Sequence, residues 1–517
     1  MTQTTGRSPA PLRVPPETMW GLVGGWSAAL PRTRRLAARL LRAPEAIIAV
    51  LGLVVFTWRI GVPSAWWDEA ITRDIVSRPT GDIVSLVGSI DLVHATYYLL
   101  VHLVVGDEAG LTGIRLLSAA AAAATGVLLV RIGRELDATR VGVVAGLAWT
   151  VAPLASRYAQ EARPYAFVAL AVTAATLAML RVCRKPWLRR RWVAYAAARV
   201  VVGLLNVLAL TVLSAHLVYV AATASPAVRR RWYLAAAGAV VLLLPVLAGS
   251  ATQRAQVSWL PRPGTEQLLG FYDAQYAVAP VLVALLALAV AGLGRGTHAT
   301  ALGLGLTWAL LPPVLLWSVS QVHPLFDWRY VFFALPGTAL ALGALATLLR
   351  PIYVAVALLT LGALGWHMQQ VYRYPASGHA EDVRGAAQVI GDGARAGDAV
   401  LFLPSSRRVV KLGYPDEFRS VDDLALAQDG PASATLWGVE TTPGDVAAAL
   451  RQRTRVWVVT GPRRYGEGDD RTEREKQRLL AADFRLAQAT VKYRYEVRLY
   501  VRNTRAVAIP AEDLSGS

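Results

Sequence analysis

Long apolar runs alternate with short polar loops along most of this chain. Each run approaches the roughly 20 residues with which a helix crosses the hydrocarbon core of a bilayer. One apolar stretch, residues 193–224, is too long for a single crossing, so we divide it near Asn206. We therefore predict membrane-spanning helices at residues 46–60, 113–132, 140–156, 164–182, 193–206, 208–224, 232–249, 276–294, 299–319, 329–348 and 352–370, eleven in all.

The segment "HATYYLLVHLVVG" (residues 94–106) is apolar but covers only about half a span. If it crossed the membrane, the Arg-containing loops 131–140, 181–191 and 229–232 would face outward, against the tendency of basic loops to remain in the cytoplasm. If it lies in the interface, these loops all face the cytoplasm together with residues 31–42. We adopt the interfacial placement, which puts the N-terminus inside and the C-terminus outside.

The pattern changes near residue 376, where charge rises and apolar runs shorten. "AEDVRGAAQVIGDGARAGDAVLFLP" and "DVAAALRQRTRVWVVTG" each predict a helix followed by a buried strand. "REKQRLLAADF" predicts a helix, and "RLAQATVKYRYEVRLYVR" alternates like a strand pair. We expect a disordered cytoplasmic tail (1–43), an all-α polytopic membrane domain (44–375) and a small extracytoplasmic α/β domain (376–517).

Composition supports a multi-span membrane protein, because 55% of the 517 residues are hydrophobic, only 17% are charged and the mean hydropathy is +0.40. The net charge of +18 comes from arginines in short loops, so membrane orientation explains it and nucleic acid is not an indicated partner. Arginine greatly outnumbers lysine, which is typical of GC-rich bacteria and indicates a bacterial plasma membrane. The single cysteine, Cys183, excludes an intramolecular disulfide.

Four clusters of ionisable and aromatic residues fall on the predicted outer surface, whereas the cytoplasmic loops carry mainly basic residues. The first is the adjacent pair Asp68–Glu69 after the first span, with Arg73 a turn later. Such a pair can hold a general base or a metal ion. It can equally lie at the start of a helix, because acidic side chains are favourable at a helix N-terminus.

The second cluster, "DLVHATYY", contains Asp91, His94 and Tyr97 at the start of the interfacial segment. It can bind substrate through its polar side chains. The alternative is structural, with Asp91 as a helix cap and the tyrosines in the aromatic belt of the membrane surface.

The third and fourth clusters combine arginine with tyrosine directly before a span. "RYAQEARPYA" contains Glu161, Arg163 and Tyr165, and "HPLFDWRYVFFALPG" contains Arg329 and Tyr330. Arginine binds phosphate through its planar set of donors. The alternatives are a self-paired surface cluster for the third motif and an interfacial arginine for the fourth.

Together, "WWDEA", "YYLL", "YAQEARPYA" and "WRYVFFALPG" resemble the GT-C superfamily of integral-membrane glycosyltransferases. The resemblance covers about residues 44–375 and is strongest to the bacterial branch related to protein O-mannosyltransferases and aminoarabinose transferases. It implies transfer of a sugar, here expected to be mannose, from a polyprenyl-phosphate donor to a protein, glycolipid or glycan acceptor outside the cytoplasm, with inversion.

The resemblance also implies roles for individual residues. Asp68 corresponds to the aspartate that deprotonates the acceptor, and Glu69 is the adjacent acid at the catalytic centre. Donor phosphate is the implied ligand of Arg163, Tyr165, Arg329 and Tyr330. Substrate contacts are implied for Arg73, Asp91, His94, Tyr97 and Glu161. His94 departs from the family's "HPP" pattern, because alanine and threonine replace the prolines. Related oligosaccharyltransferases hold a divalent metal, but we expect neither metal nor cofactor here, since Arg163 lies so near Glu161.

The chemistry of the donor fits these roles, because the departing lipid phosphate gains negative charge that nearby arginines can stabilise. A lipid-linked sugar transporter or flippase is the main alternative, and such proteins usually place ionisable residues in mid-membrane. Here the interiors of the predicted spans are nearly free of ionisable residues, and Arg199 and His216 are the clear exceptions. A non-enzymatic envelope assembly factor is a third possibility. The scarcity of ionisable residues inside the spans favours chemistry at the outer surface over transport, and the assembly factor stays open.

Overall fold

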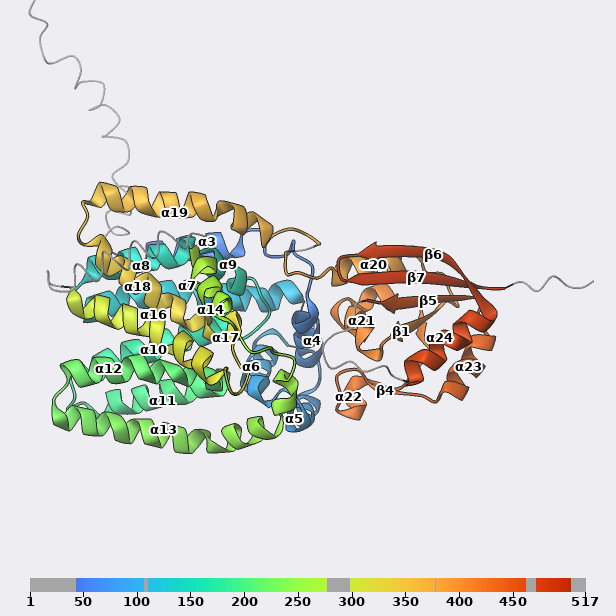
Figure 1. The fold of residues 1–517 in the computed structure, drawn as a ribbon, viewed down its shortest axis with the longest axis horizontal. Helices are drawn as coiled ribbons and strands as arrows, with labels where there is room; N and C mark the ends of the chain where they lie inside the picture. The colour runs from blue at the N-terminus through green and yellow to red at the C-terminus, as the bar shows by residue number, and fades with distance from the viewer. Residues whose placement is uncertain (1–42, 107–109, 277–297, 377, 462–470, 504–517) are drawn as a thin grey trace, which may run out of the picture.

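The computed structural model describes residues 43–106, 110–276, 298–376, 378–461 and 471–503. A bundle of helices forms one end of the elongated molecule, and an α/β domain forms the other (Figure 1). Residues 1–42 of the predicted N-terminal tail (1–43) and nearly all of the predicted span 276–294 lie outside the described residues.

A helix lies at every predicted span position apart from 276–294. Within the described residues, six helices are long and apolar enough to cross a membrane, or seven if the bent pair α8–α9 counts as one span. The number of eleven spans therefore stays a prediction. The principal helices of the bundle are α3 (Pro44–Thr57), α7 (Leu111–Glu135), α8 (Thr139–Val151), α9 (Pro153–Ala159), α10 (Tyr165–Arg184), α11 (Arg189–Leu205), α12 (Leu213–Thr223), α13 (Pro226–Thr252), α16 (Ala299–Val319), α18 (Leu335–Ala346) and α19 (Pro351–Val371).

The predicted division near Asn206 is confirmed. Helix α11 ends at Leu205, and the extended Asn206 accepts a hydrogen bond from the Leu208 amide at 2.9 Å, which starts the 3₁₀ helix η3 (Val207–Val212). A second break separates α8 from α9 by 68°, because Pro153 cannot donate its amide to the preceding turn. This bend leads the chain into the loop that carries Glu161 and Arg163.

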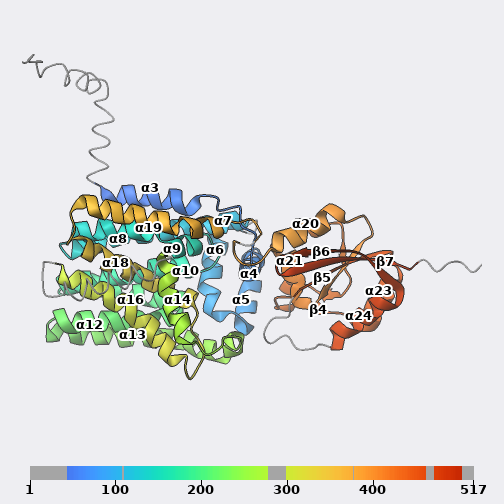
Figure 2. The ribbon, with the colours of Figure 1, turned by 45° about the horizontal axis from the view of Figure 1, so that its top comes forward.

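Short helices lie between the bundle and the α/β domain, as Figures 1 and 2 show for α4, α5 and α6. Helix α6 has 11 residues, and the interfacial placement of this segment stays a prediction. The other short elements in this region are η2 (Leu92–His94), η4 (Arg254–Val257) and α17 (Trp328–Val331), beside α4 (Trp67–Val76), α5 (Thr80–Ser89) and α6 (Ala95–Val105). Two further short elements, α14 (Thr265–Tyr276) and η5 (Phe332–Ala334), pack against helices of the bundle.

The α/β domain contains a five-stranded sheet in the order β2-β1-β5-β7-β6. Strand β1 is fully buried and runs parallel to β2 and β5, whereas β7 pairs antiparallel with β5 and β6. Its main elements are α20 (Val383–Gly393), β1 (Ala399–Leu403), α21 (Val409–Gly413), α23 (Pro443–Arg451), β5 (Arg455–Thr460), α24 (Arg471–Asp483), β6 (Phe484–Lys492) and β7 (Tyr495–Arg502). The predicted helix–strand units and the final strand pair are confirmed.

Several short elements of this domain were not predicted. They are η6 (Ser405–Arg408), η7 (Pro415–Phe418), β2 (Asp422–Asp423), β3 (Leu426–Gln428), α22 (Gly430–Ser433) and β4 (Val439–Glu440). Apolar packing continues from the bundle into the domain, because Ala70 and Ile71 of α4 belong to the same buried cluster as Val409 and Val410 of α21. One hydrophobic cluster therefore spans both domains, and the α/β domain has a second cluster of its own.

Candidate active site

Asp68 lies in the first turn of α4, directly between the two domains. The chain is extended at Trp66 and becomes helical at Trp67, so Asp68 and Glu69 occupy the helix N-terminus, where carboxylates interact favourably with the dipole. In a helix, neighbouring residues point in different directions. The two acids consequently enter different surroundings.

The Asp68 carboxylate contacts arginines from two distant loops. Its Oδ2 atom lies 3.0 Å from Nη1 of Arg329 and 3.7 Å from Nη2 of Arg163. Both arginines are largely buried, whereas the Asp68 side chain is 23% exposed. Three of the predicted clusters therefore meet at one carboxylate.

Arg163 also joins the second cluster. Its guanidinium donates to Nε2 of His94 at 2.8 Å and to the Tyr98 hydroxyl at 3.3 Å, and Tyr98 in turn donates to Asp91 at 2.9 Å. Burial, together with the Arg163 charge, lowers the pKa of the His94 imidazole. The ring is therefore neutral, and it accepts the Arg163 hydrogen bond through Nε2.

Arg329 is held by aromatic rings. Its guanidinium carbon lies 5.5 Å from the ring centre of Trp66, 5.2 Å from that of Trp259 and 5.5 Å from that of Tyr330, within cation–π range. Asp327 caps the short α17 by accepting from the Arg329 amide at 3.1 Å. The loop and the rings thus fix where this cation points.

A cavity of about 580 Å³ opens in front of these groups and is bounded by both domains. On the membrane side it is lined by residues that include Asp68, Asp91, His94, Arg163, Arg329 and Tyr330. The α/β domain contributes Glu381, Arg407, Leu436, Arg494 and Tyr495.

A second cavity of about 740 Å³ adjoins the first, because both are lined by Val93, His94, Gln256, Val257 and Tyr330. Its remaining lining is mainly apolar, with contributions from Leu205, Val207, Leu208, Leu247, Leu260, Val319 and Leu325. A polar chamber with paired charges is thus continuous with an apolar one.

Glu69 does not line either cavity. It is fully buried and accepts two hydrogen bonds from Arg115, at 2.8 and 2.7 Å, and one from the Ala162 amide at 2.8 Å. Nδ1 of His379 lies 3.0 Å from the same carboxylate. Although burial favours the protonated form, Arg115 and His379 hold the pKa of Glu69 well below its usual range.

Glu161 is also buried outside the cavities. Its Oε1 lies 3.1 Å from Nε of Arg157, an ion-pair distance, yet neither carboxylate oxygen has a well-directed hydrogen bond from the described residues. Burial raises the pKa of Glu161 to about 7 against the opposing effect of Arg157.

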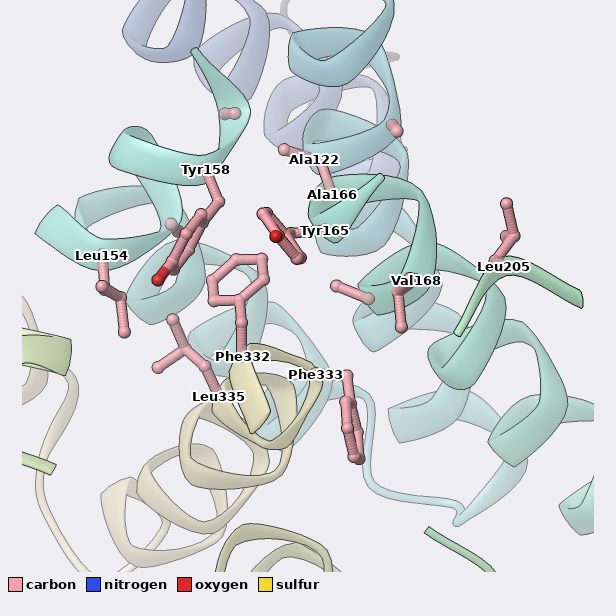
Figure 3. Packing of buried hydrophobic residues seen from close by; sticks show 14 of the residues in the cluster. Ala122, Leu154, Tyr158, Tyr165, Ala166, Val168, Leu205, Phe332, Phe333 and Leu335 are labelled. Carbon is pink, nitrogen blue, oxygen red and sulfur yellow. The ribbon is translucent and has the colours of Figure 1, made fainter. Parts of the chain in front are cut away.

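The other predicted site residues support the cavity from behind. Arg73 donates to the Leu412 carbonyl at 3.1 Å and so faces α21. Tyr97 packs against Phe167, with ring centres 5.6 Å apart. Tyr165 packs against Tyr158, whose ring also faces Phe332, as Figure 3 shows. These side chains are therefore placed to position the site.

Sequence reasoning missed Arg115, His379 and all the groups from the α/β domain. Arg115 carried a signal, because an arginine near the start of an otherwise apolar span generally has a specific partner. His379 follows the last span in an ordinary polar segment and carried none. Among the described residues, no three His, Cys, Asp or Glu side chains gather as metal ligands. Metal-independent chemistry remains a prediction.

Comparisons with known proteins agree with the resemblance. Residues 93–248 match the family model of dolichyl-phosphate-mannose-protein mannosyltransferases. The structure of ArnT from Cupriavidus metallidurans bound to undecaprenyl phosphate is similar at a TM-score of 0.60 and 13% identity, covering 88% of this chain and 97% of ArnT. Its apo structure gives 0.60 and 14%, covering 90% and 98%. None of the curated proteins matches this chain in sequence.

At this identity, the similarity to ArnT establishes a common fold. The predicted resemblance to GT-C membrane glycosyltransferases is thereby confirmed in fold and, for residues 93–248, in sequence. The chain is a multi-pass membrane protein with an α/β domain at its C-terminal end.

Proposed function

We propose that this chain is a membrane glycosyltransferase that moves a sugar from a polyprenyl-phosphate donor to an extracytoplasmic acceptor. The observation that carries the proposal is the contact of Asp68 with Arg163 and Arg329 in a cavity that continues into an apolar one. The family model and the fold shared with ArnT, which was solved with undecaprenyl phosphate, support it.

The two cavities match the two halves of such a donor. The apolar cavity suits the first isoprene units, since burying hydrocarbon there removes it from water and from ordered headgroups. The phosphate then lies where the cavities join, near Tyr330, and within reach of Arg163 and Arg329. Their planar donor sets are suited to two phosphate oxygens.

Donor binding would exchange the partners of Asp68. In the structure, this carboxylate is paired with both guanidinium groups. A donor phosphate competes for the same cations, so the Asp68 side chain is released toward the acceptor side of the cavity. There its carboxylate can accept the proton of the acceptor hydroxyl.

Transfer then proceeds as a single displacement. The acceptor oxygen forms a bond to the anomeric carbon while the bond from that carbon to the phosphate oxygen breaks, and polyprenyl phosphate leaves with the electron pair. Attack from the face opposite the phosphate inverts the configuration. Arg163 and Arg329 stabilise the charge on the departing phosphate, and each such preorganised donor contributes on the order of 10²–10³ in rate.

Glu69, which the family resemblance placed at the catalytic centre, is proposed instead to hold α4. Its carboxylate is fully engaged by Arg115, His379 and the Ala162 amide.

We propose mannose as the sugar, after the family model that matches residues 93–248. No metal enters the proposed reaction.

The test is donor turnover by the full-length protein in lipid nanodiscs. The protein is incubated with polyprenyl phosphates carrying mannose, arabinofuranose and other sugars, and release of polyprenyl phosphate is followed by mass spectrometry. Consumption of the mannosyl donor with an inverted product, identified by NMR, is the expected result. Failure to consume any donor with any acceptor would reject the proposed function.

Asp68→Asn is the variant that tests the base. It preserves shape but cannot accept the proton, so transfer should fall by about 10²–10⁴. Donor binding should not weaken, because the variant no longer competes for Arg163 and Arg329. Asp82→Asn on neighbouring α5 is the matched control and should transfer normally. If the transfer activity of Asp68→Asn stays within tenfold of wild type, Asp68 is not the base. A defect in lipid translocation without donor cleavage would indicate a transporter.

A further inference from the structure

Two indole rings lie beside Arg329, the arginine that is proposed to bind the donor phosphate. Its guanidinium carbon is 5.5 Å from the ring centre of Trp66 and 5.2 Å from that of Trp259, and both residues line the polar cavity. Trp66 packs against the hydrophobic cluster that spans both domains. Trp259 is 38% exposed and belongs to none of the hydrophobic clusters of the described residues. Trp259 therefore presents ring surface to the cavity rather than to a core.

The loop that carries Trp259 is fixed on both sides of the indole. Before it, the Gln253 side chain accepts a hydrogen bond from the Leu92 amide at 2.9 Å. After it, Leu260 is buried and lines the apolar cavity. The chain thus passes from one cavity to the other at this point, and Trp259 lies on the polar side of their junction.

The proposed donor places its sugar close to this ring. A single oxygen joins the anomeric carbon to the phosphate, so the sugar begins directly beyond the phosphate that Arg329 binds. Asp68, the proposed base, lies 3.0 Å from the same guanidinium. Phosphate, base and the Trp259 ring therefore meet around Arg329, and a sugar bound between phosphate and base is within reach of the indole.

An aromatic face suits a sugar ring. A pyranose in its chair form carries C–H groups on one face, and their partial positive charge is attracted by the negative face of an indole. Stacking also removes apolar surface of both partners from water. The hydroxyl groups at the edge of the sugar stay free to bond to polar groups of the cavity.

Holding Arg329 does not by itself account for the Trp259 ring. Without Trp259, this arginine keeps its ion pair with Asp68 and its contacts with the rings of Trp66 and Tyr330. A third ring, partly exposed in the cavity, adds little to a cation that is already held in this way. Its open surface is available to a substrate.

We propose that Trp259 is the platform on which the donor sugar stacks, so that it helps to select a sugar ring with an apolar face. This inference rests on the proposed function, because it assigns the sugar of the same donor. It gives the loop between η4 and α14 a direct part in substrate selection.

Equilibrium binding without acceptor tests the platform separately from turnover. Full-length protein in nanodiscs is titrated with two polyprenyl phosphodiesters of equal charge, one carrying mannose and the other only a methyl group. The ratio of their dissociation constants isolates the contribution of the sugar, because the lipid and the phosphate are common to both. An indole–sugar contact predicts that the mannosyl diester binds roughly 3- to 10-fold more tightly.

Trp259→Leu should remove this preference, since leucine keeps apolar volume but has no aromatic face. Trp259→Phe should retain part of it. A displacement of Arg329 would weaken both diesters alike and cancel in the ratio. Trp328→Ala is the matched control and should keep the full ratio, because this indole is 37% exposed but lines neither cavity. The melting temperature of each variant verifies its folding.

Equal binding of the two diesters to wild type, or an undiminished ratio in Trp259→Leu, would overturn the platform while leaving the donor phosphate site intact. A loss in Trp328→Ala as large as that in Trp259→Leu would also overturn it, because the effect would then not depend on a ring in the cavity. Failure of both diesters to bind would instead reject the proposed donor site, and the platform with it.

Discussion

The adjacent acidic residues Asp68 and Glu69 have different surroundings in this molecule. Asp68 faces a cavity and contacts Arg163 and Arg329, whereas Glu69 is buried against Arg115. Sequence alone could not separate them, because both fit a helix N-terminus and both fit a catalytic pair. The difference arises from the angle of about 100° between successive side chains on a helix, which turns one carboxylate toward the cavity and the next toward the core.

Glu161 leads to a prediction about pH. Its pKa is raised to about 7 from the usual 4.5, so the folded state keeps a proton that the unfolded state loses earlier. Stability should therefore fall as pH rises from about 4.5 to 7 and stay lower above that window. Glu161→Gln cannot ionise, so its stability relative to wild type should improve by about 3 kcal/mol across the window.

The measurement is the apparent melting temperature of both proteins in detergent between pH 5 and 8. Glu475→Gln, on the partly exposed surface of α24, serves as the matched control and should follow the wild-type profile. A gap between Glu161→Gln and wild type that does not change with pH would show that Glu161 is ionised in the folded protein throughout.

At the scale of elements, α4 is the part on which the site depends, and it is held from three directions. Glu69 connects it to α7 through Arg115 and to the segment after α19 through His379, and Arg73 connects it to α21. An element of ten residues has little stability of its own. Its position, and with it the position of Asp68, therefore comes from these tertiary contacts.

Replacing Glu69 by Gln should destabilise the protein strongly. The variant leaves the buried Arg115 charge without its counter-ion, and breaking a buried pair in this way costs about 3–5 kcal/mol. Thermal unfolding in detergent, followed by tryptophan fluorescence, measures the loss. Asp416→Asn, which breaks an exposed pair with Arg419, is the control and should melt close to wild type. A Glu69→Gln protein as stable as that control would show that the pair is not needed to hold α4.

Element prediction from sequence succeeded where a periodic pattern was long enough. The strand "AVLFL" and the break at Asn206 were both predicted, because each changes the local apolar pattern over several residues. Strands β2 and β4 have two residues each and therefore show no period. The bend between α8 and α9 was also missed, although Pro153 marks it, since the apolar run continues through the proline.

At the scale of the whole molecule, the cavity belongs to neither domain alone. The sequence predicted two domains and placed four clusters on one side, and the structure brings residues of all four clusters together at Arg163 and Asp68. It could not predict that Glu381 and Arg494 would complete the cavity, because no local pattern records how two domains dock. The hydrophobic cluster that spans both domains packs the two walls of the cavity against each other.

The orientation of the whole molecule yields the last prediction. If the basic loops lie in the cytoplasm, the cavity and the α/β domain face outward in the bacterial plasma membrane. Cys183 is the only cysteine, so Cys183→Ala provides a background for single reporters. Arg419 lies on the exposed surface of the α/β domain, and Arg230 lies near the start of α13 in a predicted cytoplasmic loop. Arg419→Cys and Arg230→Cys are therefore the two reporters.

A membrane-impermeant maleimide should label Arg419→Cys in intact spheroplasts and should label Arg230→Cys only after permeabilisation. The reverse pattern would put the α/β domain, and with it Asp68 on the packed helix α4, on the cytoplasmic side, which would mean that the whole bundle is inserted in the opposite orientation. Labelling of both reporters from outside would instead contradict the predicted number of membrane crossings between residues 230 and 419. Since a donor with a long polyprenyl tail presents its phosphate at one leaflet at a time, the labelled face also determines the leaflet from which the apolar cavity receives it.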